Sequence, residues 1–204
     1  IIFGENYNYE KNTYGFCYND DQGKINLPLP NLSGDFQISN VSTAIATARK
    51  LDKFKIADSH IKEAIIKIRS EGRLQNITQG KLRNYVSKNN QILIDGAHNP
   101  LAASAIEKYL GTLNSKRKII MLLGMMANKE HKKFIQMFKN RVHSIIALDI
   151  PNQENFIEKV KLSKVARSCG IPSKTENSIR SALKNISKEN ENAIIFCTGS
   201  LYFA

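Results

Sequence analysis

The feature that most constrains this fold is a seven-residue segment, Ile94-Asp95-Gly96-Ala97-His98-Asn99-Pro100. An apolar run, Ile92–Ile94, leads into it, and apolar residues at helical spacing follow from Leu101 to Leu110. Gly96 permits a tight turn. Asn99 followed by Pro100 is typical of a helix N-cap and its first helical position. The segment therefore predicts a strand, a tight turn and a helix.

Asp95 stands where the predicted strand ends. Ligands of open α/β sheets bind outside the carboxyl ends of the strands, and the first turn of the next helix offers unpaired N–H groups to an anion. A carboxylate here can accept hydrogen bonds from ribose hydroxyls or an adenine amine. A plain strand–turn–helix would account for Asn99 and Pro100, but it leaves Asp95 and His98 together unexplained. The pattern therefore favours a nucleotide site.

Strand and helix patterns alternate along the chain beyond Glu71 and Gly72. The strand-like runs are Leu74–Ile77, Ile92–Asp95, Ile119–Leu123, Ser144–Asp149 and Ala193–Cys197, and the helix-like runs are Leu101–Tyr109, Lys129–Lys139, Phe156–Cys169 and Ser178–Ile186. This alternation predicts an α/β fold with a mostly parallel, Rossmann-like sheet covered by helices on both faces. Gly170 is a natural stop for the third helix.

The first 71 residues have a different pattern. Aromatic and turn residues alternate over residues 1–35, which predicts two or three strands with a hairpin turn at Asn19–Gly23. Helical spacing follows over Asn40–Leu51 and Ser59–Ser70, with Ser59 as the expected N-cap. We therefore expect two domains, residues 1–71 and 72–204.

Five ordered segments resemble the motifs of one enzyme family. Ile94–Pro100 resembles the D-x-A-H-N-P signature of the Mur ligase superfamily. Four others narrow the resemblance to the folylpolyglutamate synthase/dihydrofolate synthase family: Leu27–Asn40, Gly72–Gln75, Leu123–Glu130 and Cys197–Phe203. Asp35 and Asn128 depart from the family pattern, and the second departure removes a carboxylate. The resemblance implies a Mur-ligase-type C-terminal domain at 72–204, preceded by the end of the central ATPase domain at 1–71.

The resemblance also implies a reaction. Enzymes of this family use ATP to join glutamate to folate, dihydropteroate or both through an acyl phosphate. Their phosphate loop, G-x-x-x-x-G-K-[ST], is not found in this sequence, which begins at Ile1. We therefore expect the chain to be the C-terminal half of such a ligase and to be inactive alone. The P-loop domain and the Mg²⁺ ligands would lie in the other half.

Arg73 is the catalytic residue that the resemblance implies, and it is also expected to contact ATP. A guanidinium stays protonated and can bind phosphate oxygens through two parallel hydrogen bonds. A lysine would keep the charge but lose this fork. The alternative is a solvated surface arginine, but the position of Arg73 in the motif favours the catalytic interpretation.

Asn40, Asp95 and His98 complete the implied ATP site. Asn40 matches the family position that contacts ATP through a side-chain amide, although a helix N-cap would explain it almost as well. His98 is expected to stack on the nucleotide or hydrogen-bond it. A hydrogen bond that fixes the loop is the alternative for His98.

Lys129 and Ser200 are candidates for substrate binding. Lys129 is expected between a strand end and a helix, where it could meet an anionic substrate, although a solvated lysine explains it too. Ser200 belongs to a strand-end turn that could bind a carboxylate, but a turn with an N-cap accounts for it as well. The histidines and cysteines lack metal-binding spacing, so no metal site is expected.

Composition narrows the remaining possibilities. The chain is 42% hydrophobic and 24% charged, as in ordinary globular proteins. Its longest apolar run, Ile119–Ala127, is too short to span a membrane. The net charge of +12 suits anionic substrates, and the dispersed lysines give no nucleic-acid motif. Three scattered cysteines and the absence of a signal peptide favour the cytoplasm. The alternatives are a fragment of a peptidoglycan Mur ligase and a non-catalytic nucleotide-binding remnant.

Overall fold

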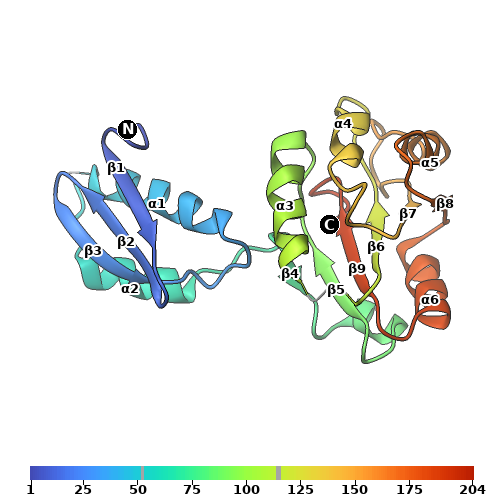
Figure 1. Cartoon of the computed structure of the whole chain (residues 1–204), viewed down its shortest axis with the longest axis horizontal. Helices are drawn as coiled ribbons and strands as arrows, with labels where there is room; N and C mark the ends of the chain where they lie inside the picture. Colours follow the sequence, from blue (N-terminus) through green and yellow to red (C-terminus); the bar gives the residue numbers. More distant parts are fainter. Residues whose placement is uncertain (52, 114–115) are drawn as a thin grey trace. The chain divides into compact units, whose positions relative to one another are not determined.

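The computed structural model describes residues 1–51, 53–113 and 116–204. They form two compact units, Ile1–Glu71 and Gly72–Ala204 (Figure 1). Among the described residues, none of the helices combines the length and the apolar character that crossing a bilayer requires.

The first unit contains an antiparallel sheet in the order β1-β2-β3. The strands are β1 (Tyr7–Lys11), β2 (Gly15–Asp20) and β3 (Gly23–Pro28). The predicted hairpin turn joins β2 to β3, and Gly23 has the positive φ of +105° that favours glycine there. Side chains alternate along each strand, so one face is buried, with Phe16, Tyr18, Ile25 and Leu27 pointing to the core.

Two helices, α1 (Phe36–Arg49) and α2 (Asp58–Lys67), complete this core with Ile38, Val41, Ile45, Ile61 and Ile65. The predicted helix starts were wrong. α1 begins four residues before Asn40, because Gln37 and Ile38 are buried and extend its packed face. α2 begins before Ser59, so the N-cap position falls on Ala57, which has no side-chain acceptor.

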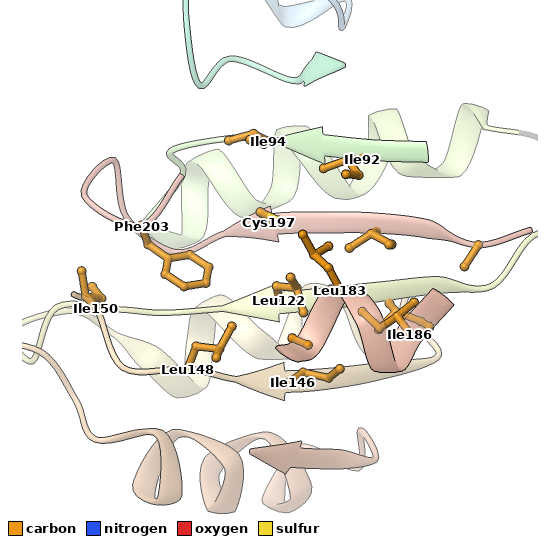
Figure 2. Close-up of a cluster of buried hydrophobic side chains, with 14 residues drawn as sticks. Ile92, Ile94, Leu122, Ile146, Leu148, Ile150, Leu183, Ile186, Cys197 and Phe203 are labelled. Carbon is orange, nitrogen blue, oxygen red and sulfur yellow. The ribbon is translucent and has the colours of Figure 1, made fainter. Parts of the chain in front are cut away.

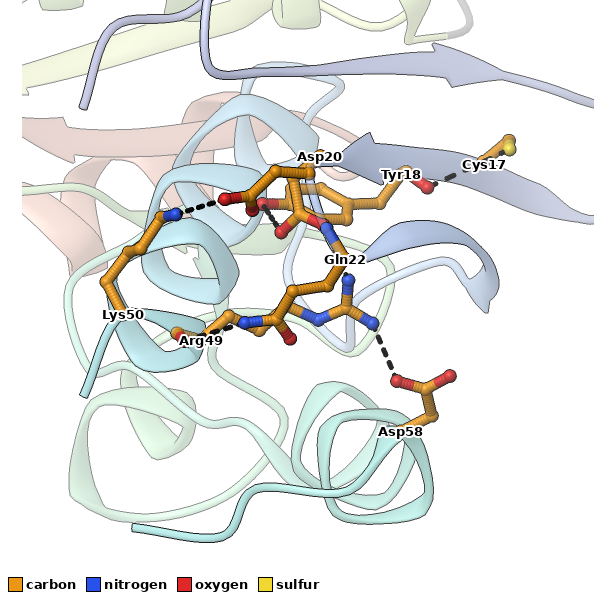
Figure 3. A network of polar contacts seen from close by, with 8 residues as sticks. Cys17, Tyr18, Asp20, Gln22, Arg49, Lys50 and Asp58 are labelled. Carbon is orange, nitrogen blue, oxygen red and sulfur yellow. Dashed lines mark hydrogen bonds and ion pairs between the residues drawn. The ribbon is translucent and has the colours of Figure 1, made fainter. Parts of the chain in front are cut away.

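A buried ion-pair network joins these elements (Figure 3). Arg49, the last residue of α1, donates to Asp20 of β2 at 2.8 Å and to Asp58 of α2 at 2.6 Å. The side chains of Arg49 and Asp20 are only 6% and 4% exposed. Tyr18 donates to the same Asp20 carboxylate at 3.0 Å, and burial together with this bond raises its pKa. One arginine therefore fixes both helices to the sheet.

The second unit contains a six-stranded sheet in the order β4-β5-β9-β6-β7-β8. The strands are β4 (Gln75–Asn76), β5 (Gln91–Ile94), β6 (Ile119–Leu123), β7 (Ser144–Ala147), β8 (Ser173–Thr175) and β9 (Ile194–Thr198). β4 is antiparallel to β5 and every other pair is parallel, which confirms the predicted α/β fold with a mostly parallel sheet.

Helices cover both faces of this sheet (Figure 1). They are α3 (Pro100–Thr112), α4 (His131–Gln136), α5 (Lys159–Ser168) and α6 (Ile179–Glu189). α6 packs on one face through Ala182, Leu183 and Ile186 (Figure 2). The opposite face includes Phe196, whose ring packs against that of Phe138, just beyond α4. The two ring centroids are 6.2 Å apart. A short 3₁₀ helix, η1 (Lys81–Tyr85), contacts α6 and, like β8, was not predicted.

The helix ends agree in part with the sequence analysis. Asn99 caps α3 by accepting the Ala102 N–H at 2.9 Å, with Pro100 next to it, and Gly170 ends α5 at a φ of +81°. These predictions are confirmed. α4 begins at His131, two residues after the predicted start of the helix-like run, so Lys129 lies in the loop between β6 and α4.

The last strand determines where a site can form. β9 enters the sheet between β5 and β6, so the strand order changes direction there. Such switch points open a crevice beyond the carboxyl ends of the strands. Ile94, Thr198 and Leu123 end the three strands. Ile94 is paired with Cys197 of β9, and the next residue, Thr198, is paired with Leu123 of β6.

Candidate functional site

The loops that leave β5, β9 and β6 are tied to one another by hydrogen bonds. The N–H of Gly199 donates to the carbonyl of Ala97 at 3.0 Å, and the hydroxyl of Thr198 donates to the same oxygen at 3.3 Å. The N–H of Gly124 donates to the carbonyl of Thr198 at 3.3 Å. Two backbone hydrogen bonds and one from the Thr198 hydroxyl therefore hold the loops of the candidate site together.

Asp95 lies at the centre of this edge and is 2% exposed. One carboxylate oxygen accepts the N–H of Leu74 at 2.9 Å, and the other accepts the N–H of Ala97 at 2.8 Å. Each oxygen has a second lone pair, so the carboxylate retains capacity to accept from a ligand. Asp95 thus joins the segment before β4 to the turn after β5.

The environment of Asp95 opposes its charge. Burial raises the pKa of this carboxyl group, while the two backbone N–H donors and the positive charge of Arg73 act in the other direction. Desolvation is the largest of these effects. A cationic or hydrogen-bonding ligand that reached Asp95 would therefore stabilise its ionised form.

Arg73 sits in a sharply bent segment. Its neighbours Gly72 and Leu74 both have positive φ values, +64° and +45°, and a leucine rarely adopts such a conformation. The carbonyl of Gly72 accepts the N–H of Gly96 at 2.8 Å, and Leu74 is held by Asp95. The Arg73 side chain is exposed. Its backbone is fixed while its guanidinium faces solvent.

His98 and Ser200 lie in loops at the same edge. A ring nitrogen of His98, Nδ1, is 3.0 Å from the carbonyl oxygen of Gly96, which is the loop-fixing contact considered as the alternative for this residue. Its other ring nitrogen remains available to a ligand. Ser200 is 3% exposed, and its hydroxyl accepts the N–H of Tyr202 at 3.1 Å, as expected for a turn.

Lys129 and Asn40 belong to other segments of the chain. Lys129 belongs to the loop that follows β6, where its N–H donates to the carbonyl of Met126 at 3.3 Å. Asn40 belongs to α1 of the first unit, where its side-chain amide donates to Gln37 at 2.9 Å. Arg73, Asp95, His98 and Ser200 are therefore the predicted residues that the fold brings to one edge.

Leu74 was missed by the sequence analysis. It supplies the N–H that binds Asp95, and its side chain is 1% exposed. Apart from Gly72 two residues before it, no local pattern marks this leucine as a residue with positive φ. The bent conformation depends on an acid 21 residues away, which periodicity does not reveal.

Charge is distributed unevenly between the two units. Residues 1–71 hold nine basic and nine acidic side chains, whereas residues 72–204 hold 21 basic and nine acidic ones. The net charge of +12 therefore belongs to the second unit, where it would attract anions. Among the described residues, no group of three or more His, Cys, Asp or Glu side chains lies close enough together to hold a metal ion.

Comparison with known proteins identifies the second unit. Residues 72–201 match the family model described as "Mur ligase, glutamate ligase domain". Folylpolyglutamate synthase of Lacticaseibacillus casei is 25% identical over 193 residues, 93% of this chain and 41% of that protein. Dihydrofolate synthase/folylpolyglutamate synthase of Escherichia coli strain K12 is 26% identical over 128 residues, 62% of this chain and 27% of that protein.

Solved structures show the same fold over nearly the whole chain. E. coli FolC in complex with DHPP and ADP matches with a TM-score of 0.81 and 19% identity, covering 98% of this chain and 44% of that one. Folylpolyglutamate synthase of Mycobacterium tuberculosis, complexed with ADP and AMPPCP, matches with a TM-score of 0.77 and 18% identity, over 98% and 47%. The chain thus spans less than half the length of these relatives.

Proposed function

This chain belongs to the Mur ligase family, and from that membership we propose that it is the C-terminal half of an ATP-dependent ligase that adds glutamate to folate, dihydropteroate or both. The first unit would be the end of a central ATPase domain, and the second the glutamate ligase domain. The bent Arg73 segment held by Asp95 is the observation that carries the proposal.

Arg73 is the residue to which we assign catalysis. Transfer of the ATP γ-phosphoryl group to a carboxylate needs positioning and charge stabilisation more than covalent help from the protein. A guanidinium provides two parallel donors and a permanent charge to the phosphate oxygens. Because the Arg73 backbone is anchored on both sides, its side chain can reach out from a fixed base.

Asp95 and His98 would hold the nucleoside. Asp95 has lone pairs left for a ribose hydroxyl or an adenine amine, but its 2% exposure restricts it to a donor that enters the crevice deeply. His98 keeps one ring nitrogen for the same ligand, since the other faces the Gly96 carbonyl. A sugar hydroxyl near Asp95 would also favour its ionised form.

Asn40 would contact the nucleotide from the first unit. The Nδ2 of Asn40 donates a hydrogen bond to Gln37. The amide oxygen of Asn40 can then accept a hydrogen bond from an adenine amine. Lys129 and Ser200 remain proposed contacts of the acidic substrate. Ser200 can donate its hydroxyl proton, because its oxygen already accepts from Tyr202.

The phosphate cradle and the Mg²⁺ ligands would come from a P-loop domain outside these 204 residues. A related bifunctional synthase has been solved with Mn, AMPPNP and L-glutamate bound. A bound Mg²⁺ would supply charge neutralisation as the γ-phosphoryl group passes from ATP to the substrate carboxylate, leaving ADP and an acyl phosphate. The glutamate amine would then attack the acyl carbon, forming the amide and releasing inorganic phosphate. The chain's own proposed contribution is to orient ATP and stabilise charge through Arg73.

Mutation of Arg73 in the complete protein tests this proposal. Arg73→Ala should lower folate-dependent ADP release about 100-fold or more, and Arg73→Lys should recover only part of it, because lysine lacks the fork. Lys164→Ala, an exposed cation on α5, is the matched control and should leave the rate unchanged. Equal rates for Arg73→Ala and the control would overturn the assignment.

A second assay tests the half-enzyme assignment. The purified 204-residue chain, given ATP, tetrahydrofolate and glutamate, should release no ADP. Folate-dependent ADP release from this chain alone would contradict the proposal. Activity of the complete protein on a UDP-muramoyl substrate in place of folate would instead identify a peptidoglycan Mur ligase.

A further inference from the structure

We infer that Leu201 is a positioning residue that holds the Arg73 segment in its bent, ligand-ready conformation. The inference rests on the proposed function, since that function gives Arg73 its role. Leu201 lies in the turn that follows β9, far from Arg73 in sequence. Its own side chain is 54% exposed, so it does not belong to the hydrophobic core.

Leu201 covers the hydrogen bond that anchors Arg73. A Cβ atom placed on Gly96 would lie 2.6 Å from Leu201 Cγ, and one placed on Gly72 would lie 3.5 Å from Leu201 Cδ2. The Leu201 side chain therefore occupies the space beside Gly96, and its Cδ2 is the atom nearest to the Cβ position of each glycine. Those two residues make the 2.8 Å bond from the Gly96 N–H to the Gly72 carbonyl. Because both glycines are buried and Leu201 is the side chain nearest to each, Leu201 is the group that would keep water from the bond immediately before Arg73.

The contact depends on the absence of a side chain at Gly96. Gly96 does not have a positive φ, so its backbone conformation is open to alanine. The space that an alanine methyl group would need is filled by Leu201. Glycine at this position is therefore explained by the approach of Leu201 and not by backbone conformation.

The turn that carries Leu201 is anchored on both sides. Ser200 before it is 3% exposed, and Phe203 after it is 5% exposed. Figure 2 shows the Phe203 ring directed back into the buried cluster, between β9 and β6. A Cβ atom on Gly124 would lie 2.7 Å from this ring, so the ring packs directly on the end of β6. Leu201 is consequently held over the glycines by buried neighbours.

This arrangement gives Arg73 two independent supports. Asp95 holds the N–H that follows Arg73, and Leu201 covers the hydrogen bond that precedes it. The strained φ of Leu74 requires such support, since residues in this region persist only when their surroundings fix them. Removal of Leu201 should loosen the segment without unfolding the sheet, because the side chain is half exposed.

Amide hydrogen exchange on the 204-residue chain tests the contact itself. Leu201→Ala should speed exchange at Gly96 about tenfold by freeing the bond to local opening, and Leu201→Met should restore slow exchange. Tyr202→Ala is the matched control: Tyr202 is 66% exposed and keeps its backbone bond to Ser200, so Gly96 should be unaffected. Equal Gly96 exchange in Leu201→Ala and wild type would overturn the inference.

Gly96→Ala provides a complementary test. The added methyl group should displace Leu201 and speed exchange at residue 96 in the same way. Combined with Leu201→Ala it should add little, because the methyl group then has room. Fully additive effects would show that the two side chains do not share this space, and the contact would be rejected.

The consequence for Arg73 is tested separately, in the complete protein. Leu201→Ala should lower kcat/KM for ATP about tenfold, and it should have no further effect when Arg73 is already alanine. An additive loss would mean that Leu201 acts on general stability and would reject the positioning role. If Arg73→Ala itself changes nothing while Gly96 exchange still responds to Leu201→Ala, the proposed function fails and the contact stands.

Discussion

The carboxylate of Asp95 accepts the backbone N–H of Leu74 at 2.9 Å, so the acid that ends β5 fixes the residue next to Arg73. The same carboxylate accepts the N–H of Ala97 at the start of the turn. Asp95 is therefore structural whether or not it also contacts a nucleotide. Its removal would disturb both the fold of the site and the position of the arginine.

Replacement of Asp95 should reduce stability measurably. Asp95→Ala leaves two buried N–H groups without acceptors, for which we expect a loss of about 2–4 kcal/mol in the free energy of unfolding. Asp95→Asn should lose less, since its amide oxygen still accepts one of them. Urea denaturation of both variants measures the difference, and an alanine variant as stable as wild type would show that water replaces the carboxylate.

The stability contributed by Asp95 should depend on pH. Burial raises the pKa of Asp95 above the ordinary value of 3.8. At a pH between these two pKa values, the carboxyl group is protonated in the folded chain and ionised in the unfolded chain. That contribution is fully present below about pH 4 and declines as the pH rises through the folded pKa. Asp95→Asn has no titratable group at this position, so its stability lacks this dependence on pH.

The unfolding free energy of wild type minus that of Asp95→Asn should therefore fall as the pH increases from 4 upward. Parallel urea titrations of the two proteins across this range provide the measurement. A difference that grows with pH would mean that the N–H donors of Leu74 and Ala97 outweigh desolvation at Asp95.

The Arg49–Asp20 pair should be essential to the first unit. Asp20→Ala leaves a buried guanidinium with Asp58 as its remaining acid, for which we expect a loss of about 3 kcal/mol. Lys11→Ala removes a solvent-exposed ion pair with Asp35 and should change stability by less than about 1 kcal/mol. Hydrogen exchange of β2 amides compares the variants, and equal losses would refute the distinction between the two pairs.

Cys197 should resist alkylation in the folded protein. Its side chain is 3% exposed, and burial raises the pKa of the thiol to about 12, so very little thiolate forms near neutral pH. Iodoacetamide at pH 8 should modify the partly exposed Cys17 first and reach Cys197 only after addition of denaturant. Peptide mapping of the labelled chain would contradict this if both cysteines reacted at the same rate.

Sequence patterns predicted the local units of this fold better than its long-range contacts. The segment from Ile94 to Pro100 predicted a strand, a turn and a capped helix, which the structure confirms as β5, the Asp95–Asn99 loop and α3. The signal was strong because each residue in it satisfies a local requirement. β8 was missed because its three residues, Ser-Lys-Thr, have no apolar pattern.

Tertiary contacts explain what the sequence did not reveal at the site. The bend at Leu74 depends on the Asp95 carboxylate, and the glycine at position 96 depends on Leu201, more than 100 residues later. Neither partner can be identified from spacing. The residue types of the candidate site were predictable from motifs, whereas the supports that hold them required the three-dimensional structure.

A nucleotide titration of the isotope-labelled 204-residue chain tests the central claim most directly. ADP at millimolar concentrations should shift the backbone amide resonances of Gly72–Leu74 and Asp95–His98, and Arg73→Ala should weaken those shifts without altering the rest of the spectrum. Shifts elsewhere, or none at these residues, would contradict the assignment of this edge of the sheet as a nucleotide site.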